Sequence, residues 1–112
     1  MAVKQGTRDR RVDGSVVYIW TGLAGGDTGS PALVTDEGPI DVQVIGAIGT
    51  SVMNLEGSMD NTNWATITLS PTPWVAATIS RASQRALYIR PNVGAGTGAA
   101  LTVIAVVQPG KV

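Results

Sequence analysis

The chain has 112 residues, and its eight basic and eight acidic side chains give a formal net charge of zero. This length predicts a single domain, and the balanced charge offers no basic surface for nucleic acid, so we expect no direct nucleic-acid partner. Cysteine and histidine are both absent, which excludes disulfides, thiol nucleophiles, Ser-His-Asp triads and zinc sites built on those ligands. No apolar run approaches the ~18 residues of a membrane-spanning helix, so no membrane association is expected.

Residues 1–14 are polar and charged and form the first predicted unit, an extended N-terminal arm. Its basic side chains are Lys4, Arg8, Arg10 and Arg11. So few apolar groups cannot offset the entropy lost when a segment becomes ordered alone. Two interpretations stay open: a frayed terminus, or an arm that becomes ordered on a partner and uses its arginines against an acidic surface. The stretch also lacks the apolar core of a secretory signal, so we expect synthesis and use in the cytoplasm, or departure inside a larger particle.

The segment 15–21, SVVYIWT, is rich in β-branched and aromatic residues and is the first predicted strand. Tyr18 and Trp20 share one face, while Val17 and Ile19 share the other. A strand that is apolar on both faces is central in a sandwich or has one face against a neighbouring subunit. Trp20 is therefore a candidate partner-binding residue.

The Gly-rich segment 22–31 is predicted as a flexible loop that can carry a contact surface, with Asp27 as its candidate partner-binding residue. A short strand is expected at 32–35 and a turn at 36–39. The alternation of Ile40, Val42 and Val44 with polar residues then predicts a half-buried strand.

The segment 52–69, VMNLEGSMDNTNWATITL, predicts a β-hairpin. Met53 and Leu55 are expected to point inward from its first strand. Ala65, Ile67 and Leu69 are expected to line one face of the second. In the loop, Gly57 accepts a positive φ, Asp60 and Asn63 can bond to their own backbone, and Trp64 anchors the turn. These four are the predicted structural turn residues.

The remainder of the chain predicts three further strands. Two prolines at 70–73 exclude a central strand there, and 74–80 is the next candidate, followed by a helical turn or polar corner at 81–85. The segment 86–93 returns to a strand, in which Pro91 marks an edge or a bulge. After a Gly-rich connection, residues 101–108 are apolar on both faces and predict a central strand. Seven to eight short strands predict an all-β fold, an antiparallel β-sandwich or jelly roll over residues 15–112.

The residues that could form a catalytic, metal or sugar site each have a simpler interpretation. Asp41, Glu56 and Asp60 could form a carboxylate pair, but outward polar residues on half-buried strands explain them better, so we expect no enzyme. The segment 60–63 could hold Ca²⁺, but it lacks EF-hand spacing, and a plain turn is favoured. Trp64 and Trp74 could form a platform for a sugar, although a cap on the core is favoured. We expect no cofactor.

Three motifs carry a resemblance: LEGSMDNTNW at 55–64, LYIRP at 87–91 and GAGTG at 94–98 before a final alternating strand. Together they resemble a class of small bacteriophage virion proteins that have a G-S-x-D-x-x-N-W hairpin followed by Y-I-R-P. The chain departs from related sandwich turns at Asn61, where glycine is usual. The resemblance implies a capsid decoration (cement) protein that binds the major capsid protein on the capsid exterior of the virion.

The resemblance also implies a homotrimer, the natural assembly at capsid three-fold positions, made in the host cytoplasm. Two alternatives stay open. A tail, neck or baseplate component would share the fold and have no reactive site. A carbohydrate-binding sandwich module would use an exposed Trp64 or Trp74.

Overall fold

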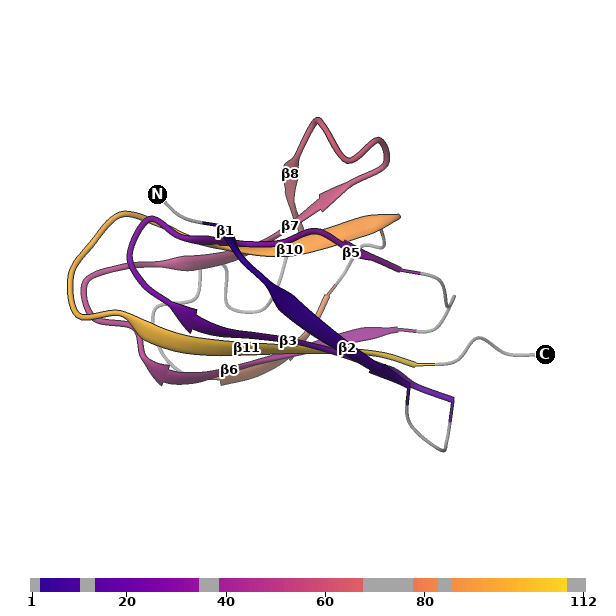
Figure 1. The fold of residues 1–112 in the computed structure, drawn as a ribbon, viewed down its shortest axis with the longest axis horizontal. Helices are drawn as coiled ribbons and strands as arrows, with labels where there is room; N and C mark the ends of the chain where they lie inside the picture. The colour runs from indigo at the N-terminus through magenta and orange to yellow at the C-terminus, as the bar shows by residue number, and fades with distance from the viewer. Residues whose placement is uncertain (1–2, 11–13, 35–38, 68–77, 83–85, 109–112) are drawn as a thin grey trace.

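The computed structural model describes residues 3–10, 14–34, 39–67, 78–82 and 86–108. Within these ranges the chain forms no helix and eleven short strands, which assemble into two sheets packed face to face (Figure 1). The predicted all-β sandwich is confirmed. The strands outnumber the predicted seven to eight because the N-terminal segment and the 22–31 loop contribute short strands of their own.

The six-stranded sheet has the order β1-β4-β10-β7-β8, with β5 paired to β10 beside β4. Its strands are β1 (Val3–Lys4), β4 (Thr28–Gly29), β5 (Ala32–Leu33), β7 (Met53–Ser58), β8 (Ala65–Ile67) and β10 (Tyr88–Val93). All pairs are antiparallel except β1 with β4. The β7–β8 hairpin projects from this sheet, away from the other one (Figure 1).

The five-stranded sheet has the order β2-β3-β11-β6-β9 and is antiparallel throughout. Its strands are β2 (Gly6–Arg10), β3 (Val16–Leu23), β6 (Ile40–Ala47), β9 (Thr78–Arg81) and β11 (Ala100–Val107). The predicted central strand at 101–108 is confirmed, since β11 lies between β3 and β6.

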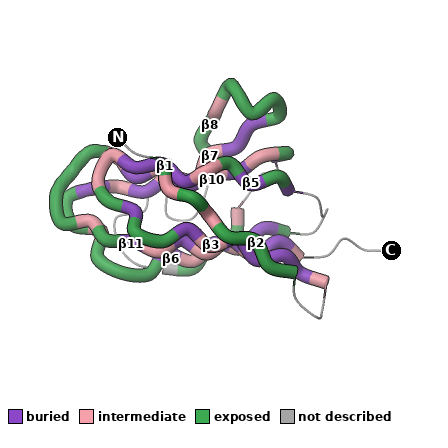
Figure 2. The backbone as a smooth tube through the Cα atoms, viewed as in Figure 1, coloured by how far each residue is buried: buried purple, intermediate pink, exposed green. Residues whose placement is uncertain are grey.

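The core lies between the two sheets and follows the period-two alternation of the strands (Figure 2). Ile40, Val42 and Val44 are at most 1% exposed, as their alternation predicts. Met53 and Leu55 meet them from the opposite sheet and are fully buried. Burying one such side chain contributes about 1.5–3 kcal/mol relative to leaving it in water.

The N-terminal segment is not a separate arm, which corrects the predicted boundary at residue 14. β1 pairs with β4 in one sheet, and β2 pairs with β3 in the other, so the chain crosses between the sheets within a few residues (Figure 1). The physical reason is that backbone pairing needs no apolar side chains. β2 satisfies the backbone groups that β3 would otherwise expose at the sheet edge.

Pro91 lies inside β10, which has neighbours on both sides. Pro91 is opposite Leu55 of β7. On the other side, β5 pairs with β10 up to Ile89, and β4 pairs with it again at Asn92. Pairing on this side is interrupted at the residue that has no N–H to donate, while the register with β7 runs through Pro91 without a bulge. The predicted edge or bulge at Pro91 is therefore wrong. Residue 29 has to be glycine at this place, because a Cβ on it would lie only 2.5 Å from Cδ of Pro91 and would clash with the ring.

The 22–31 segment is also more ordered than the predicted flexible loop. It contains β4, and the N–H of Gly26 donates to the carbonyl of Val93 at 3.0 Å. Leu23 is fully buried. The predicted turn at 36–38 and the segments 70–77 and 83–85, with Trp74, lie outside the described residues.

Candidate functional site: the cleft beside strand β2

The predicted partner-binding cations lie along the N-terminal strands. Lys4 belongs to β1, and its Nζ lies 3.9 Å from Oδ2 of Asp27. Arg8 and Arg10 belong to β2, where both are exposed, and a guanidinium N–H of Arg10 donates to the carbonyl of Gly14 at 3.0 Å. Arg11 lies outside the described residues. Three of the four predicted cations are therefore carried by one side of the sandwich.

Trp20 and Asp27, which were predicted as partner-binding residues, are both buried in the chain. Trp20 is 1% exposed, stacks on Tyr18 with ring centroids 6.3 Å apart, and donates from Nε1 to the carbonyl of Ser30 at 2.9 Å. Asp27 is 6% exposed, and its Oδ2 accepts the N–H of Ala24 at 2.9 Å. Trp20 faces the core, and Asp27 holds the loop that begins after β3.

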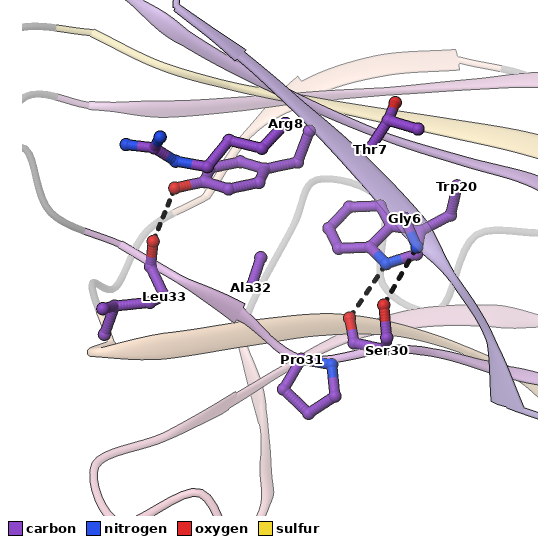
Figure 3. A pocket seen from close by; sticks show the side chains of 9 residues that line it. Gly6, Thr7, Arg8, Trp20, Ser30, Pro31, Ala32 and Leu33 are labelled. Atoms are coloured by element: carbon purple, nitrogen blue, oxygen red, sulfur yellow. Dashed lines mark hydrogen bonds between the residues drawn. The ribbon is translucent and has the colours of Figure 1, made fainter.

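A cleft of about 290 Å³ opens between β2 and the segment 30–33 (Figure 3). Tyr18 and Trp20 line it from β3. The cleft joins the edges of the two sheets, because β2 ends the five-stranded sheet and β5 pairs only with β10. It therefore lies on an open side of the sandwich, where the sheets are not closed by a shared strand.

Hydrogen bonds within the chain satisfy several polar groups of this cleft. The Tyr18 hydroxyl donates to the carbonyl of Leu33 at 2.5 Å, and the N–H of Gly6 donates to Oγ of Ser30 at 2.9 Å (Figure 3). The lining of the cleft is mainly apolar, and its two rings, Tyr18 and Trp20, are 3% and 1% exposed. Such a site suits an apolar side chain, with the Arg8 guanidinium as the charged group at its border.

Glycine at position 6 is required by the same packing. A Cβ there would lie 2.6 Å from Nε1 of Trp20. The indole thus lies directly against the backbone of β2, and the cleft begins where β2 continues to Arg8. Figure 3 shows Thr7 on the other side of β2 from Trp20.

The β7–β8 hairpin loop is shaped by the predicted turn residues. Oδ1 of Asp60 accepts the N–H groups of Thr62 and Asn63 at 2.9 and 2.8 Å. Asn61 has a φ of +60°, so it supplies the left-handed conformation that glycine supplies in related turns. The prediction of Gly57 as a turn residue with a positive φ is wrong, because Gly57 lies inside β7 between Ile89 and Ala65 and has no positive φ. Glycine is required there by packing, since a Cβ would lie 2.6 Å from Cβ of Ala86.

A second cluster lies at the base of this hairpin, on the outer face of the six-stranded sheet. The guanidinium carbon of Arg90 lies 4.1 Å from the ring centroid of Trp64, and Nε of Arg90 donates to Oε1 of Glu56 at 2.8 Å. Sequence reasoning missed this cluster. The feature that could have indicated this cluster is the pairing register of β10 with β7, because that register places Arg90 opposite Glu56.

The Asp60 carboxyl should titrate at unusually low pH. The N–H groups of Asn63 and Thr62, followed by the side chains of Asn63 and Ser58, lower its pKa well below the ordinary 3.8. Because the folded-state pKa is depressed, this carboxylate stabilises the fold above the unfolded-state pKa and loses that effect as pH falls through the folded-state pKa. NMR titration of the Thr62 and Asn63 amides should show no midpoint near 3.8. A midpoint there would contradict the bonded loop.

The residues that the structure describes contain neither a candidate metal site nor a helix that could span a membrane. Among them, no three acidic side chains gather in a way that could hold a metal ion. No helix in the described ranges has the length and apolarity needed to cross a membrane.

In comparison with known proteins, no family model, no curated protein and no solved structure matches this chain.

Proposed function

We propose that this chain is a structural virion protein of the capsid decoration type, which binds the major capsid protein from outside and stabilises the assembled head. The resemblance of the 55–64 and 87–91 motifs to small phage virion proteins motivates the assignment. The observation that carries it is the outer face of the five-stranded sheet, which is apolar at its centre.

The apolar residues of this outer face form cross-strand neighbours. Ile19 of β3 is opposite Ile104 of β11, and Val17 is opposite Val106. On β6, Gln43 is opposite Ile104 and separates it from Ile79 of β9. Val17 is 2% exposed, whereas Ile45 of β6 is 44% and Ile79 is 65% exposed. An antiparallel sheet with one face in water normally carries polar residues on that face. An apolar outer face supports a function in which another protein covers it.

Charged residues border this apolar row. At one end of β6 and β9, Nε of Arg81 lies 2.8 Å from Oδ1 of Asp41. On the other side of the sheet, Asp9 of β2 is opposite Val17 of β3. Apolar surface inside a polar border is the usual anatomy of a protein–protein interface. A protein that binds the assembled shell but not loose subunits stabilises the shell by mass action. The same face can also join copies of the chain into the proposed homotrimer. The homotrimer would lie on the exterior of the virion.

The test is the position and effect of the protein in the particle that encodes it. Antibody labelling of purified particles in the electron microscope should mark the head surface, and particles assembled without the chain should release their contents at lower temperature. Labelling confined to the tail, neck or baseplate would replace the proposal with that alternative. Light scattering of the free protein should give a molecular mass of three times 11.5 kDa. A monomer at high concentration would contradict the proposed homotrimer.

A matched pair of variants tests the apolar face itself. Ile79→Lys places a charge on the outer face of β9, whereas Met59→Lys places the same charge on the hairpin, where Met59 is 69% exposed. Both positions are exposed, so both variants should fold. Only Ile79→Lys should lower occupancy on particles, by about tenfold if one desolvated charge costs about 1.4 kcal/mol. Equal occupancy of the two variants would place the interface elsewhere.

The sugar-binding alternative finds less support. The guanidinium of Arg90 lies over the Trp64 ring at 4.1 Å. A sugar stacks on an open ring face, and Arg90 occupies one of the two faces of this ring. The observation therefore favours a structural role for Trp64.

A further inference from the structure

Strand β2 presents a sheet edge that no other described strand occupies. β2 is the last strand of its sheet and pairs with β3 alone. Such an edge offers backbone N–H and C=O groups in a row, and an extended peptide can add to it as a further strand. Beside β2 lies the 290 Å³ cleft lined by Tyr18 and Trp20. The two features are adjacent, so one ligand can use both.

The direction of the backbone groups on β2 can be read from Gly6. Its N–H donates to Oγ of Ser30, across the cleft and away from β3. Alternate residues of a strand direct their backbone groups to the same side, so the N–H and C=O of Arg8 also face away from β3. Strand addition can therefore begin at Arg8, because the Gly6 N–H is already bonded.

The side chains of an added strand follow the same alternation. Arg8 is opposite Tyr18, and Gly6 is opposite Trp20, which places these β2 residues on the cleft side of the sheet. A residue added opposite Arg8 on this face projects to the cleft. A cavity of about 150 Å³ in another protein holds benzene. A 290 Å³ cleft therefore has room for a large apolar side chain.

Charge selects the rest of the ligand. Arg8 and Arg10 lie on the same face of β2, so a residue added opposite Arg10 is the direct cross-strand neighbour of Arg10 and a diagonal neighbour of Arg8. Opposite charges stabilise cross-strand pairs, and like charges destabilise them. In an antiparallel addition, the residue opposite Arg10 precedes the residue opposite Arg8 by two positions. The favoured segment is thus acidic, any residue, large apolar, in that order.

The same register argues against a second copy of this chain as the occupant. A two-fold antiparallel pairing of β2 with itself preserves the face of each residue. Arg8 would then lie opposite Arg8, or opposite Arg10 of the other copy. Both registers place like charges together on the cleft side.

We infer that the β2 edge and its cleft receive an extended segment of a partner protein, which adds antiparallel to β2, places a large apolar side chain over Tyr18 and Trp20, and places a carboxylate beside Arg8. This inference rests on the β2 edge and the cleft beside it and does not depend on the proposed function.

The experiment is an NMR titration of the ¹⁵N-labelled full chain with three short synthetic peptides. One carries Glu-Thr-Leu at its centre; the others carry Lys-Thr-Leu and Glu-Thr-Ser. The first peptide should slow hydrogen exchange of the Arg8 amide and shift the Trp20 indole N–H signal. Each control peptide should bind about tenfold more weakly, since one loses the charge pair and the other the apolar anchor. Equal binding of all three, or no binding, would overturn the inference.

A charge change away from the cleft supplies the matched protein variant. Arg8→Gln and Met59→Glu each change the net charge by one unit in the same direction, and Met59 is 69% exposed on the hairpin, outside the lining of the cleft. Only Arg8→Gln should weaken the first peptide, by about tenfold. Equal weakening would mean that general charge, and not the edge, governs binding.

Ala32→Leu adds volume to the cleft wall and should weaken the first peptide in the same way, with the unbound indole signal of Trp20 as the check on folding. Full affinity in a folded Ala32→Leu variant would show that the peptide does not use the cleft.

A measurement without peptide tests for self-association. If protection of the Arg8 amide grows with protein concentration, a second copy of the chain is the occupant, and the proposed partner segment is overturned.

Discussion

Trp20→Ala should lower the free energy of unfolding by about 3–5 kcal/mol. The indole is 1% exposed, packs against the backbone of Gly6 and Gly29, and donates to the carbonyl of Ser30. The substitution leaves a cavity and also removes the donor from that carbonyl. Because domains of this size are stable by about 5–15 kcal/mol in total, the loss removes a large share. Urea denaturation followed by circular dichroism measures it.

Trp64→Ala is the control for that measurement. Trp64 is half-buried on the outer face and contacts Arg90 through its ring. Removing a cation–π contact near the surface costs about 0.5–1 kcal/mol. The two tryptophans should thus differ severalfold in their effect. Similar losses would contradict the assignment of Trp20 to the core and Trp64 to the outer face.

Gly46→Ala should also destabilise the fold, by about 2–4 kcal/mol, because two costs combine. Gly46 has a φ of +106°, which side-chain-bearing residues rarely adopt. A Cβ there would lie 2.3 Å from the carbonyl oxygen of Ala100, a backbone atom of the central strand β11. Thermal unfolding monitored by circular dichroism should show the loss as a lower Tm.

Gly22→Ala separates the two costs. Gly22 has a φ of +70°, but a Cβ there would meet nothing within 4 Å. It should cost only the conformational part, about 1–2 kcal/mol. If Gly22→Ala and Gly46→Ala lowered stability equally, the close approach of β6 to β11 would not be rigid.

The elements that the sequence predicts well are those with one polar and one apolar face. The alternation of Ile40, Val42 and Val44 determines which face of β6 is buried, and Met53 and Leu55 do the same for β7. β2 could not be found in this way. Its residues are stabilised through backbone pairing with β3. Arg8 and Arg10 do not alternate with apolar residues, so no hydrophobic pattern predicts a strand there.

The sequence alone indicates little of the cleft. Of the predicted cations Lys4, Arg8 and Arg10, Arg8 lines it and the other two do not, and the place of Trp20 depends on which face of β3 is inward. Both faces of that strand are apolar, so periodicity alone cannot decide between Tyr18 with Trp20 and Val17 with Ile19. The contact of Arg90 with Glu56 likewise requires the register of β10 on β7, a long-range property that no local pattern encodes.

The pairing of β3 with β11 has a consequence for biosynthesis. The central strand of the five-stranded sheet is β11, residues 100–107, and it separates β3 from β6, so these two earlier strands have no direct hydrogen-bonded contact with each other. While the ribosome is still making residues before 100, this sheet cannot close. Non-local β pairing of this kind is slow and leaves apolar strand edges exposed during folding. Nascent chains are thus most prone to aggregate just before β11 emerges, and chaperones that bind apolar strands would act in that interval.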